Sequence, residues 1–253
     1  MTKKWVQLFI LVLLMTLMTV HVFAKSEYNA HSAVGYVNPV PSAEWRASDV
    51  FWISSDEEFV NAISLINDFS GTMVEIHIIS NINLSETVAL TSHPSRVIQV
   101  FGRSMTINNE HGTTFSVDGV TLILNDVTIS GTGTGVHVQN GGTLELHNST
   151  IANNAHRGIA LTNNSTAIMH SGVIRDNGRD GILIQNSTFT MHDGLIKGNG
   201  LAGSTFHGIY ARDSAVTINR GTIEGNARHG IQFTGTPGQV AANFNNWIWR
   251  RFN

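Results

Sequence analysis

Residues 154–161 of the chain read NAHRGIAL, and residues 177–184 read NGRDGILI. Both stretches follow the pattern N-x-x-[RD]-G-I-x-[LI], in which a glycine introduces an apolar segment. The same glycine recurs at positions 112, 135, 158, 181, 208 and 230, at intervals of 23, 23, 23, 27 and 22 residues. A period between about 20 and 50 residues is typical of proteins that stack one structural unit on the next.

Each repeat contains three short stretches with the alternation of a β-strand. The first stretch follows the glycine, as in Ile159-Ala160-Leu161, where the two outer residues are apolar. The second carries apolar residues two apart, such as Leu144 and Leu146, and the third centres on an isoleucine. Alternation with a period of two residues buries one face of a strand and leaves the other face outside. Each repeat is therefore expected to supply three strands.

The third stretch supplies two columns of identical residues. The isoleucines stand at Ile129, Ile151, Ile174, Ile196 and Ile223, and an asparagine follows three residues after the last four, at Asn154, Asn177, Asn199 and Asn226. If coils of about 22–23 residues stack about 4.8 Å apart, the isoleucines form a buried ladder and the asparagines an amide ladder in a tight turn. The sequence thus predicts an all-β, right-handed parallel β-helix. The repeats of left-handed hexapeptide helices, calcium-binding nonapeptides and leucine-rich horseshoes are absent.

The composition excludes several functional classes. The 253 residues include no cysteine, which excludes a disulfide scaffold, a thiolate metal site and a cysteine nucleophile. The formal net charge is −3, so no nucleic-acid partner is expected. Only 13% of the residues are charged, which disfavours long exposed helices.

Residues 1–24 have the pattern of a cleaved signal peptide. Lys3 and Lys4 precede an apolar run from residue 8 to residue 20, and small residues stand before a cleavage site after Ala24. The run is too short to span a bilayer comfortably, although an uncleaved anchor is the alternative. We therefore expect a secreted, extracellular or cell-surface protein that has no transmembrane helix once the signal is removed.

The rest of the chain divides into three parts. Residues 25–53 are predicted to be an irregular entry segment, residues 54–235 the β-helix domain, and residues 236–253 a tail that either plugs the last coil or does not pack. Within the domain, residues 55–67 predict a helix, because Ser55 and Glu58 form a capping box and apolar residues recur at helical spacing. This helix is expected to cap the N-terminal end of the stack, since an exposed coil edge recruits other strands. The 27-residue interval predicts a loop near residues 201–204.

The repeat pattern resembles the coil repeat of the pectin-lyase-like superfamily over about residues 72–235. The capped helix, followed by Ile76-His77-Ile78 and Ile82-Asn83-Leu84, is similar to the entry of pectate-lyase-like adhesive domains of bacterial surface proteins. The superfamily includes pectate lyases, polygalacturonases, epimerases, phage tailspikes and non-catalytic adhesins. The resemblance therefore implies the fold and leaves the function open.

A charged strip precedes the repeat glycines, and polysaccharide-cleaving members of this superfamily use such a strip on one outer face. It comprises Glu110-His111, His156-Arg157, Arg179-Asp180, Phe206-His207 and Arg228-His229. A carboxylate there could act as acid or base, an imidazole could shuttle a proton, and arginines could bind sugar carboxylates. The candidate catalytic residues are Asp180, His207 and Arg179. The candidate ligand-binding residues are His156, Arg157, Arg228 and His229.

The pattern for catalysis is incomplete. Residues 177–181 and 206–208 resemble two of the four polygalacturonase motifs, but the paired aspartates and the Arg-Ile-Lys motif are missing. Hydrolysis would lack its second carboxylate, and a pectate lyase would lack the acidic cluster that holds calcium. We therefore expect a non-catalytic adhesion or polysaccharide-binding module, without a cofactor, whose partner is an extracellular polysaccharide or a cell-surface molecule. The alternative is a lyase or glycoside hydrolase that acts on acidic polysaccharide through Asp180.

A second column contains three histidines, His147, His170 and His192, with Asn125 and Asn219 at the flanking positions. Three imidazoles at coil spacing could hold a divalent metal ion. Side chains stacked in adjacent coils, however, point in parallel and do not converge on one point. We expect a stacked turn position and no metal site.

Overall fold

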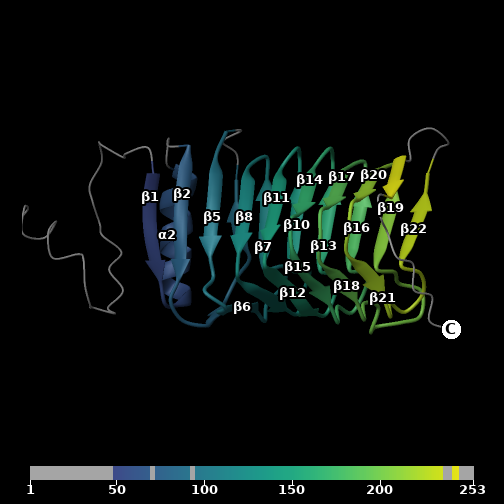
Figure 1. Ribbon diagram of the computed structural model, residues 1–253. Helices are drawn as coiled ribbons and strands as arrows, with labels where there is room; N and C mark the ends of the chain where they lie inside the picture. Colours follow the sequence, from purple (N-terminus) through teal and green to yellow (C-terminus); the bar gives the residue numbers. More distant parts are fainter. Residues whose placement is uncertain (1–47, 69–71, 92–94, 236–240, 245–253) are drawn as a thin grey trace, which may run out of the picture. The chain divides into compact units, whose positions relative to one another are not determined.

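The structure, a computed structural model, describes residues 48–68, 72–91, 95–235 and 241–244 (Figure 1). The predicted signal peptide, residues 1–24, lies outside the described residues. Between residues 48 and 244 the chain winds through three parallel sheets of nine, seven and seven strands. The predicted parallel β-solenoid is thus confirmed. None of the helices in the described ranges is long and apolar enough to cross a membrane.

Each coil contributes one strand to each sheet in turn. The first sheet contains β1 (Ser48–Ile53), β2 (Met73–Ile78), β5 (Val97–Phe101), β8 (Thr121–Asn125), β11 (Thr143–His147), β14 (Thr166–Met169), β17 (Thr188–Met191), β20 (Ala215–Ile218) and β23 (Ala241–Phe244). The second contains β3 (Ile82–Leu84), β6 (Thr106–Asn109), β9 (Thr128–Gly131), β12 (Ser149–Asn154), β15 (Gly172–Arg175), β18 (Leu195–Lys197) and β21 (Thr222–Glu224). The third contains β4 (Val88–Leu90), β7 (Phe115–Asp118), β10 (Val136–Gln139), β13 (Ile159–Thr162), β16 (Ile182–Gln185), β19 (Ile209–Arg212) and β22 (Ile231–Thr234).

The register places the repeated residues directly above one another. Ile151 pairs with Ile129 in the coil before it and with Ile174 in the coil after it, and all three are buried. On β11, Leu144 and Leu146 face the core while the residues between and beside them face outward. The core is therefore an aliphatic column enclosed by the three sheets, as the alternation of the sequence predicts.

The asparagine ladder forms as predicted. The side-chain amide of Asn154 donates to Oδ1 of Asn177 at 2.9 Å, Asn177 donates to Asn199 at 2.8 Å, and Asn199 donates to Asn226 at 2.9 Å. Each side chain also bonds backbone groups. Asn177, for example, donates to the carbonyl of Ile151 at 3.2 Å and accepts from the amide of Asn154 at 3.1 Å. The ladder thus satisfies polar groups that would otherwise be buried without partners.

The helix α2 (Asp56–Asp68) begins close to the predicted position. The hydroxyl of Ser55 accepts from the amide of Glu58 at 3.3 Å, as a capping box requires. The carboxylate of Glu58, however, accepts from the amide of Ser54 at 2.7 Å instead of the amide of Ser55. The buried rings of Phe59 and Phe115 pack edge to face, with their centroids 6.1 Å apart. The helix also contacts β1, β3 and β4.

Both predicted ends of the domain need correction. The entry segment is not irregular as far as residue 53, because Ser48–Ile53 forms β1 and pairs along its length with β2. The tail also contains a strand, because Ala241–Phe244 forms β23 beside β20. β1 lies before the first repeat glycine and β23 after the last one, so neither lies within a complete repeat. The predicted loop is present between β18 and β19, where Leu201 is exposed.

Replacing Asn177→Ala should lower the stability by about 2–4 kcal/mol, because it leaves several buried donors and acceptors without partners. Urea unfolding followed by circular dichroism measures this change. Asn83→Ala is the matched control, because Asn83 is exposed and bonds only Asn108 at 3.3 Å, so its loss should cost less than about 0.5 kcal/mol. Equal effects of the two substitutions would contradict a structural role for the buried ladder.

Candidate functional site

The charged strip lies in the turns that connect the second sheet to the third. Four of the seven predicted site residues line one hollow of about 470 Å³ in this strip, namely Arg157, Asp180, His207 and Arg228. The other lining residues are Thr205, Phe206, Tyr210, Gln232 and Thr234. Stacking therefore brings residues from turns 21 to 71 positions apart in the sequence to one place, as the repeat predicts.

Asp180 is the centre of the hollow's hydrogen bonds. Its Oδ1 accepts from the backbone amide of His207 at 2.9 Å and lies 3.2 Å from Nδ1 of the same residue. Its Oδ2 lies 3.5 Å from Nε of Arg157 in the preceding coil. Only 4% of Asp180 is exposed. Both carboxylate oxygens are thus engaged by the protein, and Asp180 holds adjacent turns together.

His207 is buried beside this carboxylate. Burial lowers the pKa of His207 below its usual value and outweighs the opposing influence of Asp180, while His229 and Arg228 lower it further. The imidazole is therefore neutral at neutral pH, and its contact with Asp180 places the proton on Nδ1. The other ring nitrogen, Nε2, is buried and has no hydrogen-bond partner within the described part of the chain.

The remaining predicted residues lie at the edge of the hollow. The guanidinium of Arg179 stands 6.0 Å from the centre of the Phe206 ring, in a cation–π arrangement. The ring of His229 stacks on His207 at 5.5 Å. His156 is exposed, and its backbone carbonyl accepts from the amide of Arg179 at 2.8 Å. These residues belong to the strip but do not line the hollow.

The sequence did not predict two residues that line the hollow, Tyr210 and Gln232. These two residues are paired neighbours on β19 and β22, and the hydroxyl of Thr234 donates to the Tyr210 oxygen at 3.1 Å. Tyr210 and Gln232 occupy the variable position of the G-I-x-[LI] part of the repeat. Since that position faces outward beside the charged turn, reading the variable residues of successive repeats would have identified them.

The charged groups of the hollow suit the binding of anions better than hydrolysis. Among the described residues that line it, Asp180 is the one with a carboxylate, whereas Arg157 and Arg228 both contribute guanidinium groups. A hydrolase needs a second carboxyl group on the opposite side of the scissile bond. Arginine guanidinium groups, by contrast, bind carboxylates through paired hydrogen bonds.

The histidine column forms a stack on the outer face of the first sheet. The rings of His147 and His170 lie 4.2 Å apart, and those of His170 and His192 lie 5.3 Å apart. The predicted stacking is thus confirmed. The sequence did not predict a role for Glu145. Its Oε2 atom lies close to Nε2 of both His147 and His170, so the two imidazoles approach the same carboxylate oxygen.

Acidification should destabilise the protein through His207. Because the pKa of His207 is lower in the folded protein than in the unfolded chain, protonation at low pH favours the unfolded chain. The full stability is present above the unfolded pKa of about 6.5 and is lost progressively as the pH falls toward the folded-state pKa. The melting temperature of the wild type should therefore fall between pH 7.5 and pH 5.5, which lie about one unit on either side of that value.

The variant His207→Gln keeps a donor for Asp180 but cannot titrate, so its decrease should be smaller. His156→Gln, which removes an exposed imidazole of the same strip, should behave like the wild type. Burial also lowers the pKa of His137, and that contribution is common to all three proteins. An identical decrease in the His207 variant would contradict a buried neutral imidazole at this position.

Comparison with known proteins identifies the family. A family model described as "Right handed beta helix region" matches residues 61–247, which is most of the chain and includes the whole hollow. No curated protein and no solved structure gives a significant match. With three parallel sheets in the structure and a family match over this length, the chain belongs to the right-handed β-helix proteins and is consistent with a pectin-lyase-like member of that fold.

Proposed function

We propose that the chain is a secreted or cell-surface β-helix protein that binds a polymer carrying carboxylates, such as an acidic polysaccharide, without cleaving it. The observation that carries this proposal is the environment of Asp180, which is buried, with Oδ1 hydrogen-bonded to His207 and Oδ2 in an ion pair with Arg157. A carboxylate that is this deeply buried and already paired with protein groups is poorly placed to attack a substrate or take up its proton. Its charge instead fixes the positions of the donors around it.

Arg228 provides the group most available to a ligand. It is exposed, and none of the described carboxylates lies within 4 Å of its guanidinium. Arg157 contributes a second guanidinium that is half-buried against Asp180. Because two guanidinium groups face one carboxylate, the hollow carries excess positive charge despite the negative net charge of the whole chain.

The backbone around the hollow is held rigid by bonds between coils. The amide of Gly181 donates to the carbonyl of His207 at 3.0 Å, and that of Gly208 donates to His229 at 2.9 Å. A ligand would therefore meet donors that are already in place, which lowers the entropy lost on binding. Adhesion along the stacked turns would follow if a polymer contacts several coils at once.

The second candidate function is a polysaccharide lyase or glycoside hydrolase. The pairing of a neutral His207 with Asp180 favours it, because a carboxylate that orients an imidazole is a common arrangement of a general base. The nitrogen that would take the proton is Nε2, however, and this atom is buried. Catalysis would require the hollow to open, whereas binding would not.

Binding should depend on Arg228. Replacing Arg228→Ala should weaken binding to polygalacturonate or alginate about tenfold, as expected for the loss of one charged pair of hydrogen bonds. Calorimetry measures this affinity, with a neutral glucan as the ligand control. Arg220→Ala removes the same charge from an exposed arginine between β20 and β21 and should leave binding unchanged. Equal losses in both variants would indicate unspecific attraction and contradict a site in the hollow.

An assay of the products separates the two candidate functions. The purified chain is incubated with pectin, polygalacturonate and alginate, and new reducing ends and unsaturated products are measured. Binding without products supports the proposal. Product formation that disappears in Asp180→Asn would overturn it in favour of an enzyme, because this substitution keeps the shape of the side chain and removes its charge.

We also propose that α2 caps the N-terminal end of the second and third sheets. Their first strands are β3 and β4, and side chains of the helix bond the backbone there. Asn67 donates to the carbonyl of Ala89 at 2.9 Å and accepts from the amide of Thr91 at 3.2 Å, while Asp56 accepts from the amide of Ser85 at 3.2 Å. These bonds occupy backbone groups that would otherwise be free to pair with another strand.

Phe59→Ala should therefore have two effects. The lost packing should lower the stability by about 3–5 kcal/mol, and loosening of the helix should cause concentration-dependent association, seen by analytical ultracentrifugation. Phe189→Ala, in the middle of the stack on β17, removes an equally buried ring and should lower the stability without causing association. Association of both variants, or of neither, would contradict the cap.

A further inference from the structure

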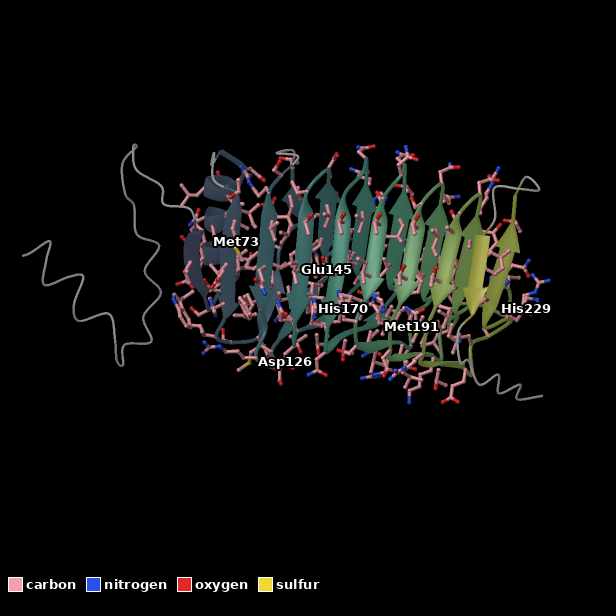
Figure 2. The ribbon with its side chains drawn as sticks, turned by 45° about the horizontal axis from the view of Figure 1, so that its top comes forward. Met73, Asp126, Glu145, His170, Met191 and His229 are labelled. Carbon is pink, nitrogen blue, oxygen red and sulfur yellow. The ribbon has the colours of Figure 1, made fainter. Side chains whose placement is uncertain are left out.

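The outer face of the first sheet carries a cluster of metal-ligating side chains away from the hollow. Glu145 and His147 stand two residues apart on β11, so both point outward, and His170 follows β14 in the next coil. Figure 2 shows Glu145 and His170 in the middle of the stack, while His229 lies near its C-terminal end. The strand alternation and the stacking of coils together place the three side chains side by side.

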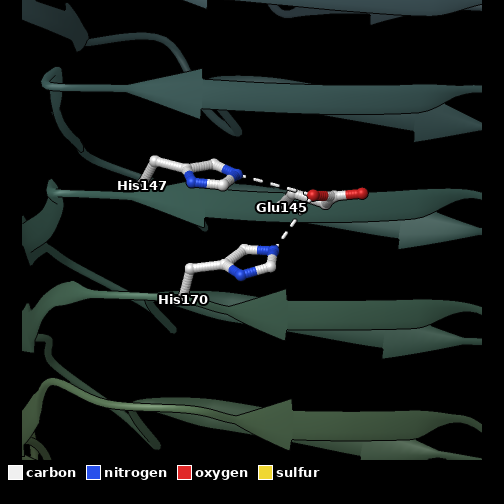
Figure 3. A group of neighbouring side chains, drawn as sticks. All are labelled: Glu145, His147 and His170. Atoms are coloured by element: carbon white, nitrogen blue, oxygen red, sulfur yellow. Dashed lines mark hydrogen bonds and ion pairs between the residues drawn. The ribbon is translucent and has the colours of Figure 1, made fainter.

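The three side chains converge on one point. Nε2 of His170 lies 3.1 Å from Oε2 of Glu145, and Nε2 of His147 lies 3.5 Å from the same oxygen (Figure 3). One ligand atom from each residue lies within 4.8 Å of the others. Ligands around a tetrahedral Zn²⁺ ion, at about 2.0–2.2 Å from the metal, are about 3.3 Å apart. Small side-chain rotations would therefore seat an ion between them.

We propose that Glu145, His147 and His170 bind a divalent transition-metal ion of the Zn²⁺ class. Two imidazoles and one carboxylate are a ligand set that zinc and its neighbours in the periodic table favour. Calcium and magnesium prefer sites built of oxygen ligands, so they fit this cluster poorly. Three protein ligands leave a fourth position for water or for an oxygen of another molecule.

The site is open to solvent and supported from one side. The exposed fractions of the side chains of Glu145, His147 and His170 are 27%, 39% and 37%, so an ion can enter directly. His192 stacks on the outer face of His170 at 5.3 Å, and its Nδ1 lies 3.0 Å from the side-chain nitrogen of Asn219. His192 therefore limits the movement of the His170 ring without joining the cluster.

Metal titration of the full chain, produced without a polyhistidine tag, tests the proposal. Calorimetry with Zn²⁺ should show one ion bound per chain, and Zn²⁺ should raise the melting temperature because it binds the folded state. Glu145→Gln and His170→Gln should each weaken this binding by at least about tenfold, since even the partners of direct ligands contribute that much. Circular dichroism in metal-free buffer checks that both variants are folded.

His192→Gln is the matched control, because it removes a neighbouring imidazole that belongs to the same stack. It should bind Zn²⁺ within about threefold of the wild type, well short of the loss expected for a ligand. The chain contains twelve histidines, so a weaker second site elsewhere would persist in every variant. Failure to bind Zn²⁺, equal loss in the His192 variant, or Ca²⁺ binding as tight as Zn²⁺ binding would each overturn the proposal.

Discussion

Parallel backbone hydrogen bonding between successive coils is the constraint on which the rest of this structure depends. Every strand of the second and third sheets pairs with strands 21 to 27 residues away, and the turns between sheets are bonded in the same way. A buried backbone group must find a partner, and in the three sheets that partner belongs to the neighbouring coil. The regular spacing of the strands, the columns of identical side chains and the position of both candidate sites follow from this rule.

Stacking at coil spacing also decides which side chains can meet. Flat rings suit the outer face of the first sheet, where Trp52, His77 and Phe101 stack at 4.5 and 4.7 Å and the three histidines continue the column farther along. Charges, by contrast, pair across coils where opposite signs occupy adjacent turns. Asp180 lies between Arg157 and His207 for this reason, and a carboxylate repeated at that position in every coil would repel its neighbours.

The sequence predicted the features that repeat, and it missed those that occur once. The isoleucine and asparagine columns revealed the sheets because five consecutive coils share the isoleucine and four share the asparagine. The strands β1 and β23 lie outside the complete repeats and became visible only through their pairing with β2 and β20. Likewise, spacing alone placed Asp180 near Arg157, but the burial of the carboxylate and of His207 depends on side-chain rotation. The contribution of Glu145 required knowing which face of β11 points outward.

The loop between β18 and β19 has a consequence for how such a protein can change its ligand. It accommodates the extra residues of the one long coil, while Ile196, Asn199 and Asn226 keep their places in the columns. Thr205 and Phe206, at the end of this loop, line the hollow. The wall of the hollow can therefore be lengthened or replaced without altering the coils beneath it. The architecture separates a fixed scaffold from an adjustable rim, so new specificity can evolve there at little risk to folding.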